Sequence, residues 1–216
     1  MGIRGVLFDF GLTLAYPPSF DELVGRAGRA LGRDLGDIQA FIDAVNGVVD
    51  DPDVLAAERR RDHSVEEHRA ADMAYAVAAH ADLDLMAGFH QLYLEPDTYA
   101  LYADVAGILG ELRARGQRIG LLSNCGWDLR RNLDHLGIDQ SFDAVVLSCQ
   151  EGMVKPDPAL FELACDRLGT VAAETLMVGD SPSTDGRAVE AGLEALVLPL
   201  PHGPVRGLEV VLDRLA

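Results

Sequence analysis

Lysine and positive charge are scarce in this sequence. Lys155 is the only lysine among 18 basic side chains, while 35 aspartates and glutamates bring the formal net charge to −17. Such a charge repels nucleic acid and anionic lipid, and the one basic cluster, Arg59 to Arg61, is typical of a solvated helix face. We therefore expect no nucleic-acid partner and no membrane partner. The acidity itself fits either a high-salt host or biased codon usage.

Long apolar runs and cysteines are also few. Runs such as 6–8 and 144–147 are far too short to cross a bilayer, and the sequence opens on a strand-like segment rather than on a cleavable leader. Cys125, Cys149 and Cys165 are odd in number and lack metal-type spacing, which predicts buried or free thiols. These features predict a cytoplasmic protein, and the hydrophobic content of 49% predicts a globular one.

Short apolar segments alternate with helical patterns through most of the chain. The strand-like segments are 3–8, 118–122, 144–148, 175–178 and 195–198, and the helical patterns between the later ones are 105–115, 129–136, 158–168 and 185–191. This alternation predicts an α/β fold with a doubly wound parallel sheet that is covered on both faces. Ligands of such sheets bind at the carboxyl ends of the strands.

The stretch 17–95 interrupts that alternation. Its apolar residues recur at three- and four-residue spacing, which predicts a small all-helical domain with its own core. We therefore expect two domains. Residues 1–16 and 96–216 would form the α/β core, and residues 17–95 would form the helical insertion.

Four polar segments fall near the ends of the predicted strands, where the sheet brings them together. They are Asp9 to Leu14, Ser123-Asn124, Lys155 to Pro158 and Gly179 to Asp185. In this order they resemble the four motifs of the haloacid dehalogenase-like hydrolase superfamily, and the helical insertion is similar to that family's small cap. The resemblance spans essentially the whole chain. It implies a phosphatase-type hydrolase whose active site lies where cap and core meet.

The resemblance implies roles in phosphoryl transfer for these residues. Asp9 is the expected nucleophile, whose carboxylate would form an aspartyl phosphate and divide a slow hydrolysis into two easier steps. Lys155, as a compact point charge, would neutralise the phosphate and the nucleophile together. The hydroxyls of Thr13 and Ser123 would hold phosphoryl oxygens. The expected phosphate- or substrate-binding residues are Ser123, Asn124, Lys155, Phe10 and Gly11.

A magnesium ion is implied by the same resemblance. Carboxylates gathered around a phosphate repel it, so a hard cation must bridge them, and Mg²⁺ suits a site of few carboxylates, a carbonyl oxygen and waters. The expected ligands are Asp9, the backbone carbonyl of Gly11, Asp180 and Asp185.

The sequence departs from the family pattern at two positions. Family phosphatases usually carry a second aspartate two residues after the nucleophile, followed by glycine, but here these positions hold Gly11 and Leu12. In the family that aspartate protonates the leaving oxygen and later activates water. Its loss removes a general acid and base worth roughly 10²–10⁴ in rate. The metal contact survives, because a backbone carbonyl makes it.

Several interpretations remain open. The first is a Mg²⁺-dependent phosphatase of a small phosphorylated metabolite, a monomer or homodimer, in which water, a good leaving group or a cap side chain replaces the missing acid. The cap candidates are His63, His68, Tyr75, His90 and Tyr93. The second is a degenerate family member that binds a phosphorylated ligand or a partner protein with little turnover. Dehalogenation is disfavoured because dehalogenases of this superfamily need no metal, whereas Gly179 to Asp185 resembles an intact magnesium motif. Phosphonate cleavage is disfavoured because the relatives that perform it need a lysine in the cap, and the cap here has none.

Overall fold

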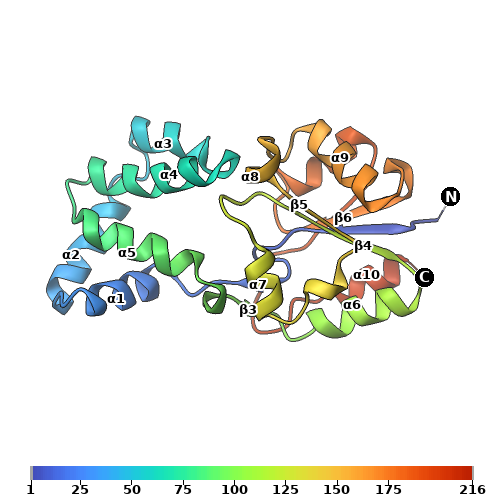
Figure 1. Ribbon diagram of the computed structural model, residues 1–216, viewed down its shortest axis with the longest axis horizontal. Helices are drawn as coiled ribbons and strands as arrows, with labels where there is room; N and C mark the ends of the chain where they lie inside the picture. Colours follow the sequence, from blue (N-terminus) through green and yellow to red (C-terminus); the bar gives the residue numbers. More distant parts are fainter. Residues whose placement is uncertain (1, 216) are drawn as a thin grey trace.

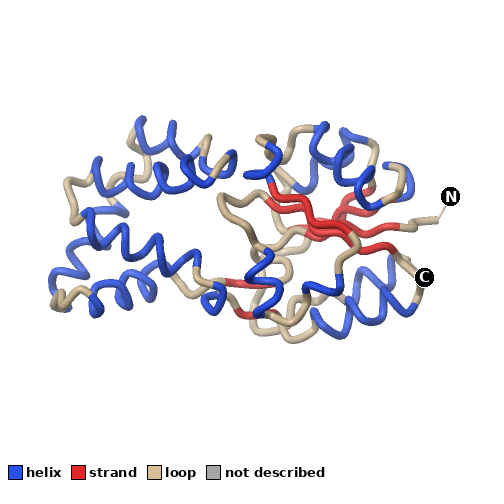
Figure 2. Tube along the Cα trace, viewed as in Figure 1, coloured by secondary structure: helices blue, strands red, loops and turns tan. Residues whose placement is uncertain are grey.

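Five parallel strands form the central sheet. The computed structural model describes residues 2–215, and its strands run in the spatial order β5-β4-β1-β6-β7. Their bounds are β1 Gly5–Phe8, β4 Arg118–Ser123, β5 Ala144–Leu147, β6 Thr175–Gly179 and β7 Glu194–Val197. Figures 1 and 2 show the sheet edge-on with helices on both sides. The predicted doubly wound α/β fold is confirmed, and each strand starts or ends within two residues of its predicted bounds.

Each face of the sheet has its own hydrophobic cluster. Because side chains alternate along a strand, Val6 and Phe8 of β1 face one way and Leu7 faces the other. Helices α6 Val105–Ala114 and α10 Glu209–Arg214 cover the first face, and α9 Pro158–Leu168 and the 3₁₀ helix η5 Asp185–Ala191 cover the second (Figure 1). With both faces buried, the strands read as continuous apolar runs.

The part of the chain between Tyr16 of β2 and Pro96 contains helices and, in the described residues, no strand. Its helices are α1 Phe20–Ala30, α2 Leu35–Asn46, α3 Pro52–Glu58, η1 Arg61–His63, α4 Val65–Ala78 and α5 Leu83–Leu94. We call residues 17–95 the helical region. Its α-helices begin after Ser19, Asp34, Asp51, Ser64 and Asp82, and each of these side chains accepts a hydrogen bond from a backbone N–H of the first turn.

The helical region has a core of its own, as its periodicity predicts. Leu23, Phe41 and Met86 belong to one buried cluster that is separate from the two clusters of the sheet. Helix α1 packs against α5 and α3 against α4, and the two pairs lie on opposite sides of this region in Figure 1. The end of the region nearest to the sheet lies beside the carboxyl ends of the strands.

Two short strands join the helical region to the sheet. β2 Ala15–Tyr16 leaves the core and β3 Ala100–Leu101 returns to it, and they pair antiparallel. Two-residue strands carry no readable periodicity, so the sequence did not predict them. The remaining elements are short: α7 Arg130–His135, α8 Ser148–Glu151, and the 3₁₀ turns η2 Pro96–Thr98, η3 Asp139–Ser141 and η4 Ala172–Glu174.

Two details of the secondary structure differ from the expectation. The pattern at 185–191 forms a 3₁₀ helix rather than an α-helix, with Gly192 in the left-handed conformation at its end. Ser148, which was expected to end a strand, instead begins α8. Within residues 2–215, no helix combines the length and the apolar character needed to span a bilayer.

Candidate active site

Lys155 lies at the centre of a buried cluster at the carboxyl edge of the sheet. Its Nζ donates hydrogen bonds to Asp9 Oδ1 at 2.7 Å, to Asp185 Oδ1 at 2.6 Å and to the Leu122 carbonyl at 3.0 Å. Asp9 directly follows β1, Leu122 lies in β4 and Asp185 begins η5 after β6. The side chains of Lys155 and Asp185 are only 2% exposed, so bulk water does not screen these charges.

Three carboxylates converge at this point. Oxygens of Asp9, Asp180 and Asp185 all lie within 4.8 Å of one another. The close approach depends on Gly179, because a Cβ at that position would lie 2.2 Å from the Asp185 carboxyl carbon. The backbone N–H of Ser181 fixes the second oxygen of Asp185 at 3.0 Å. The loop after β6 thus turns tightly around one buried carboxylate.

The carboxylates and the ammonium shift one another's pKa values. Burial, with smaller contributions from Asp185 and Asp180, raises the pKa of Asp9 to about 6, although Lys155 acts in the opposite direction. Burial and the charge of Asp185 also raise the pKa of Asp180. Burial alone would lower the pKa of Lys155, but Asp9 and Asp185 raise it above its ordinary value, so the ammonium stays charged.

The donor set fits a hard divalent cation. Three carboxylates face one ammonium, which leaves the cluster negative, and carboxylate oxygens are the ligands that such cations prefer in proteins. The residues that could hold the ion are Asp9, Asp180 and Asp185, and Gly11, in the loop after β1, lines the same cleft as Asp180.

The other expected site residues have different surroundings. Ser123 and Asn124 line the cleft above the cluster, together with Phe10 and Gly11. The amide of Asn124 is already engaged, because its Nδ2 donates to the Lys155 carbonyl at 3.0 Å and its Oδ1 accepts from the Lys155 N–H at 2.8 Å. These two bonds hold the backbone that carries the lysine.

Thr13 is buried and is not among the described residues that line the cleft. It is 0% exposed, and its hydroxyl has no hydrogen-bond partner among the described residues. A buried hydroxyl without a partner is costly. Its environment differs from that of Ser123, which borders the open cleft.

Four of the twelve residues in the wall of the cleft above the cluster are aromatic. The cleft has a volume of about 320 Å³. Its lining residues are Phe10, Gly11, Leu12, Pro17, Tyr93, Tyr99, Ser123, Asn124, Cys125, Trp127, Leu129 and Asp180. Of the five side chains expected to replace the missing acid, Tyr93 lies in this wall, while His63, His68, Tyr75 and His90 are not among the described residues that line it.

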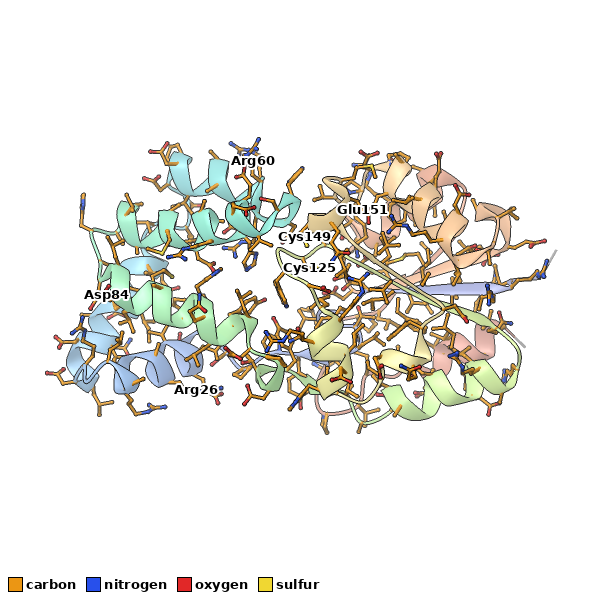
Figure 3. All side chains as sticks on the ribbon, in the orientation of Figure 1. Arg26, Arg60, Asp84, Cys125, Cys149 and Glu151 are labelled. Carbon is orange, nitrogen blue, oxygen red and sulfur yellow. The ribbon has the colours of Figure 1, made fainter. Side chains whose placement is uncertain are left out.

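The thiols are free, as the sequence predicts, and two of them lie beside this wall. The Sγ atoms of Cys125 and Cys149 lie 3.3 Å and 3.5 Å from the same acceptor, the Trp127 carbonyl. Figure 3 shows both at the side of the core that faces the helical region. The indole of Trp127 donates to Asn132 Oδ1 at 3.2 Å, which ties the wall to α7.

Arg206 contacts the loop after β1, and the sequence analysis did not single this residue out. Its Nε donates to the Leu12 carbonyl at 2.5 Å and its Nη1 to the Pro199 carbonyl at 2.8 Å. Leu12 has a positive φ of 53°, an unusual conformation that this bond helps to hold. Arg206 follows β7 at the same edge of the sheet, and its position after a strand was the one signal available.

The basic cluster at 59–61 is only partly a solvated face. Arg60 pairs with Glu67 on the surface, but Arg61 is half-buried between Glu58 and Asp72. Arg61 donates to Asp72 Oδ1 at 2.7 Å. Its guanidinium is therefore occupied by carboxylates of the helical region.

Comparisons with known proteins agree with this geometry. A phosphoserine phosphatase of Thermus thermophilus is 38% identical over 106 residues, which cover 48% of this chain and 43% of the relative, so the match spans less than half of either protein. Among solved structures, a HAD phosphatase from Thermococcus onnurineus has a TM-score of 0.66 at 22% identity over 99% of this chain and 98% of its own. The L-2-haloacid dehalogenase of Xanthobacter autotrophicus also has a TM-score of 0.66, at 23% identity over 99% and 84%.

These two structures share the fold, whether their names describe a phosphatase or a dehalogenase. The sequence model of one family, described as haloacid dehalogenase-like hydrolase, matches residues 3–192. That span holds all four polar segments and the helical region between the first two. The chain belongs to the haloacid dehalogenase-like hydrolases.

Proposed function

We propose that this protein is a Mg²⁺-dependent phosphatase that hydrolyses a small phosphorylated metabolite through an aspartyl phosphate. The observation that carries the proposal is the buried Lys155 between Asp9 and Asp185, with Asp180 beside them, at the base of a cleft. Three carboxylates and one ammonium suit a divalent cation and a phosphate dianion together. The phosphatase names of relatives such as the Thermus thermophilus protein support the same reaction class.

In the first half of the reaction Asp9 attacks phosphorus. Lys155 donates to Oδ1, so Oδ2 is the oxygen left to form the new bond. As that O–P bond forms, the bond from phosphorus to the leaving oxygen breaks, and the leaving oxygen takes up a proton. The magnesium ion, when bound, neutralises charge on the phosphoryl oxygens. Lys155 and the hydroxyl of Ser123 at the cleft base contribute further positive potential and hydrogen bonding.

In the second half water attacks phosphorus and releases inorganic phosphate. The bond between Asp9 and phosphorus breaks, the carboxylate is restored, and the attacking water gives a proton to the Tyr93 oxygen, which gave one up to the leaving oxygen in the first half. The helical region acts as the cap in this proposal. Its Tyr93, together with Trp127 of the core, forms an aromatic wall that limits the access of bulk water to the cleft.

Tyr93 is the side chain of the helical region best placed to donate the proton that the leaving oxygen needs. It lines the cleft, whereas the aspartate usual in related phosphatases is replaced here by Gly11. Burial raises the pKa of Tyr93, so its hydroxyl stays protonated at physiological pH but is a weak acid. A substrate whose leaving group needs little protonation is therefore favoured.

A pair of substrates tests this function. p-Nitrophenyl phosphate has a leaving group that hardly needs an acid, whereas an alkyl phosphate depends on one. We expect turnover of the first that is lost on chelation and in Asp9→Asn, and much slower turnover of the second. Tyr93→Phe should reduce alkyl phosphate hydrolysis by roughly tenfold or more and leave p-nitrophenyl phosphate nearly unchanged.

Gly11→Asp restores the residue that the family pattern carries. The structure has room for it, because nothing lies within 4 Å of a Cβ built at Gly11. We expect faster alkyl phosphate hydrolysis, by up to the roughly 10²–10⁴ that a positioned acid contributes. Gly11→Asn is the matched control, since it has the same shape without the proton. An equal gain in both variants would contradict an acid–base role.

Two alternative functions predict different results. A binding protein with little turnover would show no metal-dependent hydrolysis of either phosphate but would bind a phosphorylated ligand in Asp9→Asn and wild type alike. A dehalogenase would release halide from a 2-haloacid in the presence of a chelator. Either outcome would replace the phosphatase proposal.

A further inference from the structure

Two histidines and an aspartate meet inside the helical region, behind the aromatic wall of the cleft. His68 and Asp72 lie one turn apart on α4, and His90 lies on the neighbouring α5. One potential ligand atom from each lies within 4.8 Å of the other two. All three side chains are at least 95% buried. The phosphatase mechanism above uses none of them.

His68 has no hydrogen-bond partner in the described structure. Its side chain is 3% exposed, yet neither Nδ1 nor Nε2 makes a hydrogen bond. A buried polar group without a partner is destabilising, and native structures seldom leave one unexplained. The other two members are paired, since the distance from His90 Nδ1 to Asp72 Oδ2 is 2.6 Å.

The ring of His68 is held in place by its neighbours. Its centroid lies 5.2 Å from that of Trp127 and 6.0 Å from that of Tyr93, with which it stacks. On the core side it packs on Gly126, where an added Cβ would lie 2.1 Å from the Cβ of His68. The unpartnered nitrogens therefore belong to a fixed ring rather than to one that turns to solvent.

The charges around the cluster are negative in sum. Glu58 and Asp72 flank the guanidinium of Arg61, and Asp62 Oδ1 lies 3.8 Å from His68 Nδ1. Two carboxylates thus share one guanidinium, and Asp62 adds a third negative charge beside His68. With neutral imidazoles, a divalent cation would balance this charge.

We propose that His68, Asp72 and His90 form a second metal site, for a divalent transition cation such as Zn²⁺, Co²⁺ or Ni²⁺. Imidazole nitrogens favour these ions over Mg²⁺, so the site differs in chemistry from the all-oxygen cluster at Asp9. The ligands are His68 Nε2, Asp72 Oδ2 and His90 Nδ1. Arg61 holds the other oxygen of Asp72, and Asp62 faces the second nitrogen of His68.

The distances require only small movements. Metal–ligand bonds of 2.0–2.1 Å place two ligand atoms of a tetrahedral ion about 3.3 Å apart. The distance from His68 Nε2 to Asp72 Oδ2 is 4.0 Å, and that from His90 Nδ1 to Asp72 Oδ2 is 2.6 Å. Each differs from the required separation by about 0.7 Å. Three protein ligands leave further positions for water.

The ion would join α4 to α5 at the back of the cleft wall. His68 contacts both Trp127 and Tyr93, which line the cleft, so fixing His68 also fixes that wall. The site thus stabilises the shape of the cleft without touching the reacting atoms.

Cobalt provides a direct test because the two sites give it different spectra. A cobalt ion bound by imidazoles in low coordination absorbs visible light strongly, whereas one in an octahedral oxygen site absorbs weakly. The full chain carrying Asp180→Asn, which weakens the oxygen site, is titrated with Co²⁺. We expect one equivalent to bind with strong visible bands that a large excess of Mg²⁺ does not remove.

Histidine variants in the same Asp180→Asn background assign the ligands. We expect His68→Ala and His90→Gln to lose the strong bands and to weaken Co²⁺ binding at least about tenfold. His80→Asn is the matched control, because His80 is an exposed histidine of the same region and asparagine tolerates its positive φ. Circular dichroism checks that each variant is folded.

The Asp180→Asn protein decides the question even if a histidine variant does not fold, because it retains all three ligands. Failure of this protein to bind Co²⁺ with strong bands would overturn the proposal. So would strong bands that persist in folded His68→Ala or that disappear in His80→Asn.

Discussion

Replacing Asp9, the proposed nucleophile, with asparagine should make this protein more stable while abolishing turnover. Burial, Asp185 and Asp180 raise the pKa of Asp9 from 3.8 to about 6 in spite of Lys155. One pKa unit corresponds to about 1.4 kcal/mol, so at pH 8 the ionised carboxylate lowers the free energy of unfolding by about 3 kcal/mol. Asp9→Asn removes the charge and keeps an oxygen that accepts from Lys155. We therefore expect a gain of about 3 kcal/mol.

The gain should depend on pH with a definite sign. A raised pKa means that the folded protein holds the Asp9 proton more tightly than the unfolded chain does. Below pH 3.8, the ordinary pKa, Asp9 therefore does not lower the free energy of unfolding of the wild type. As pH rises through about 6, ionisation of Asp9 progressively lowers that free energy. The advantage of Asp9→Asn should be near zero below pH 4 and about 3 kcal/mol at pH 8.

Urea unfolding in the presence of a chelator measures this difference. Wild type and Asp9→Asn are compared at pH 4 and pH 8, with the exposed Asp134→Asn as a control that should show little change. Added Mg²⁺ should then narrow the gap at pH 8, because the ion binds the native wild type more tightly. If Asp9→Asn were no more stable than wild type at pH 8, or if the difference did not vary with pH, the electrostatic reasoning would be refuted.

Three further changes probe the same cluster. Lys155→Met leaves two buried carboxylates without their cation, so urea unfolding at pH 7 should show a loss of about 3–5 kcal/mol, and phosphatase activity should disappear. Gly179→Ala places a methyl group against the Asp185 carboxyl, so the Mg²⁺ concentration for half-maximal activity should rise at least about tenfold. Gly110→Ala, which has open space around the new methyl group, should leave that concentration unchanged. Arg206→Met removes the donor that holds the loop after β1, and we expect kcat to fall by roughly tenfold or more with the fold retained, as measured by steady-state kinetics and circular dichroism.

The sheet was predictable because of how its strands are buried. Parallel strands covered on both faces read as apolar runs, and here β1 is followed by Asp9, while β4 and β6 end in Ser123 and Gly179. Asp9, Ser123 and Asp180 lie at or just after strand ends, so topology alone predicts that they meet. The helical region was predictable for a similar reason, since its apolar spacing is that of amphipathic helices.

Other parts of the site depend on contacts between residues far apart in the chain. Arg206 reaches the Leu12 carbonyl across 194 positions, and no local pattern indicates such a bond. The sequence also does not predict the hydrogen bonds between the Asn124 side chain and the Lys155 backbone, because an asparagine after a strand is typical of a turn or a pocket. His68 and His90 were noted only as possible acids, since their meeting with Asp72 depends on how α4 packs against α5.

The pairing of β2 with β3 restricts how the two halves of the molecule can move. The chain crosses from one half to the other twice, and both crossings are tied side by side in one narrow antiparallel ribbon. Any movement of the helical region relative to the sheet must therefore bend this one ribbon. The Ser148 hydroxyl also donates a hydrogen bond to the Asp62 carbonyl at 2.6 Å, which joins the sheet half to the helical region at a second place. Opening the cleft at that place would break this bond and also separate His68 from Gly126 and Trp127.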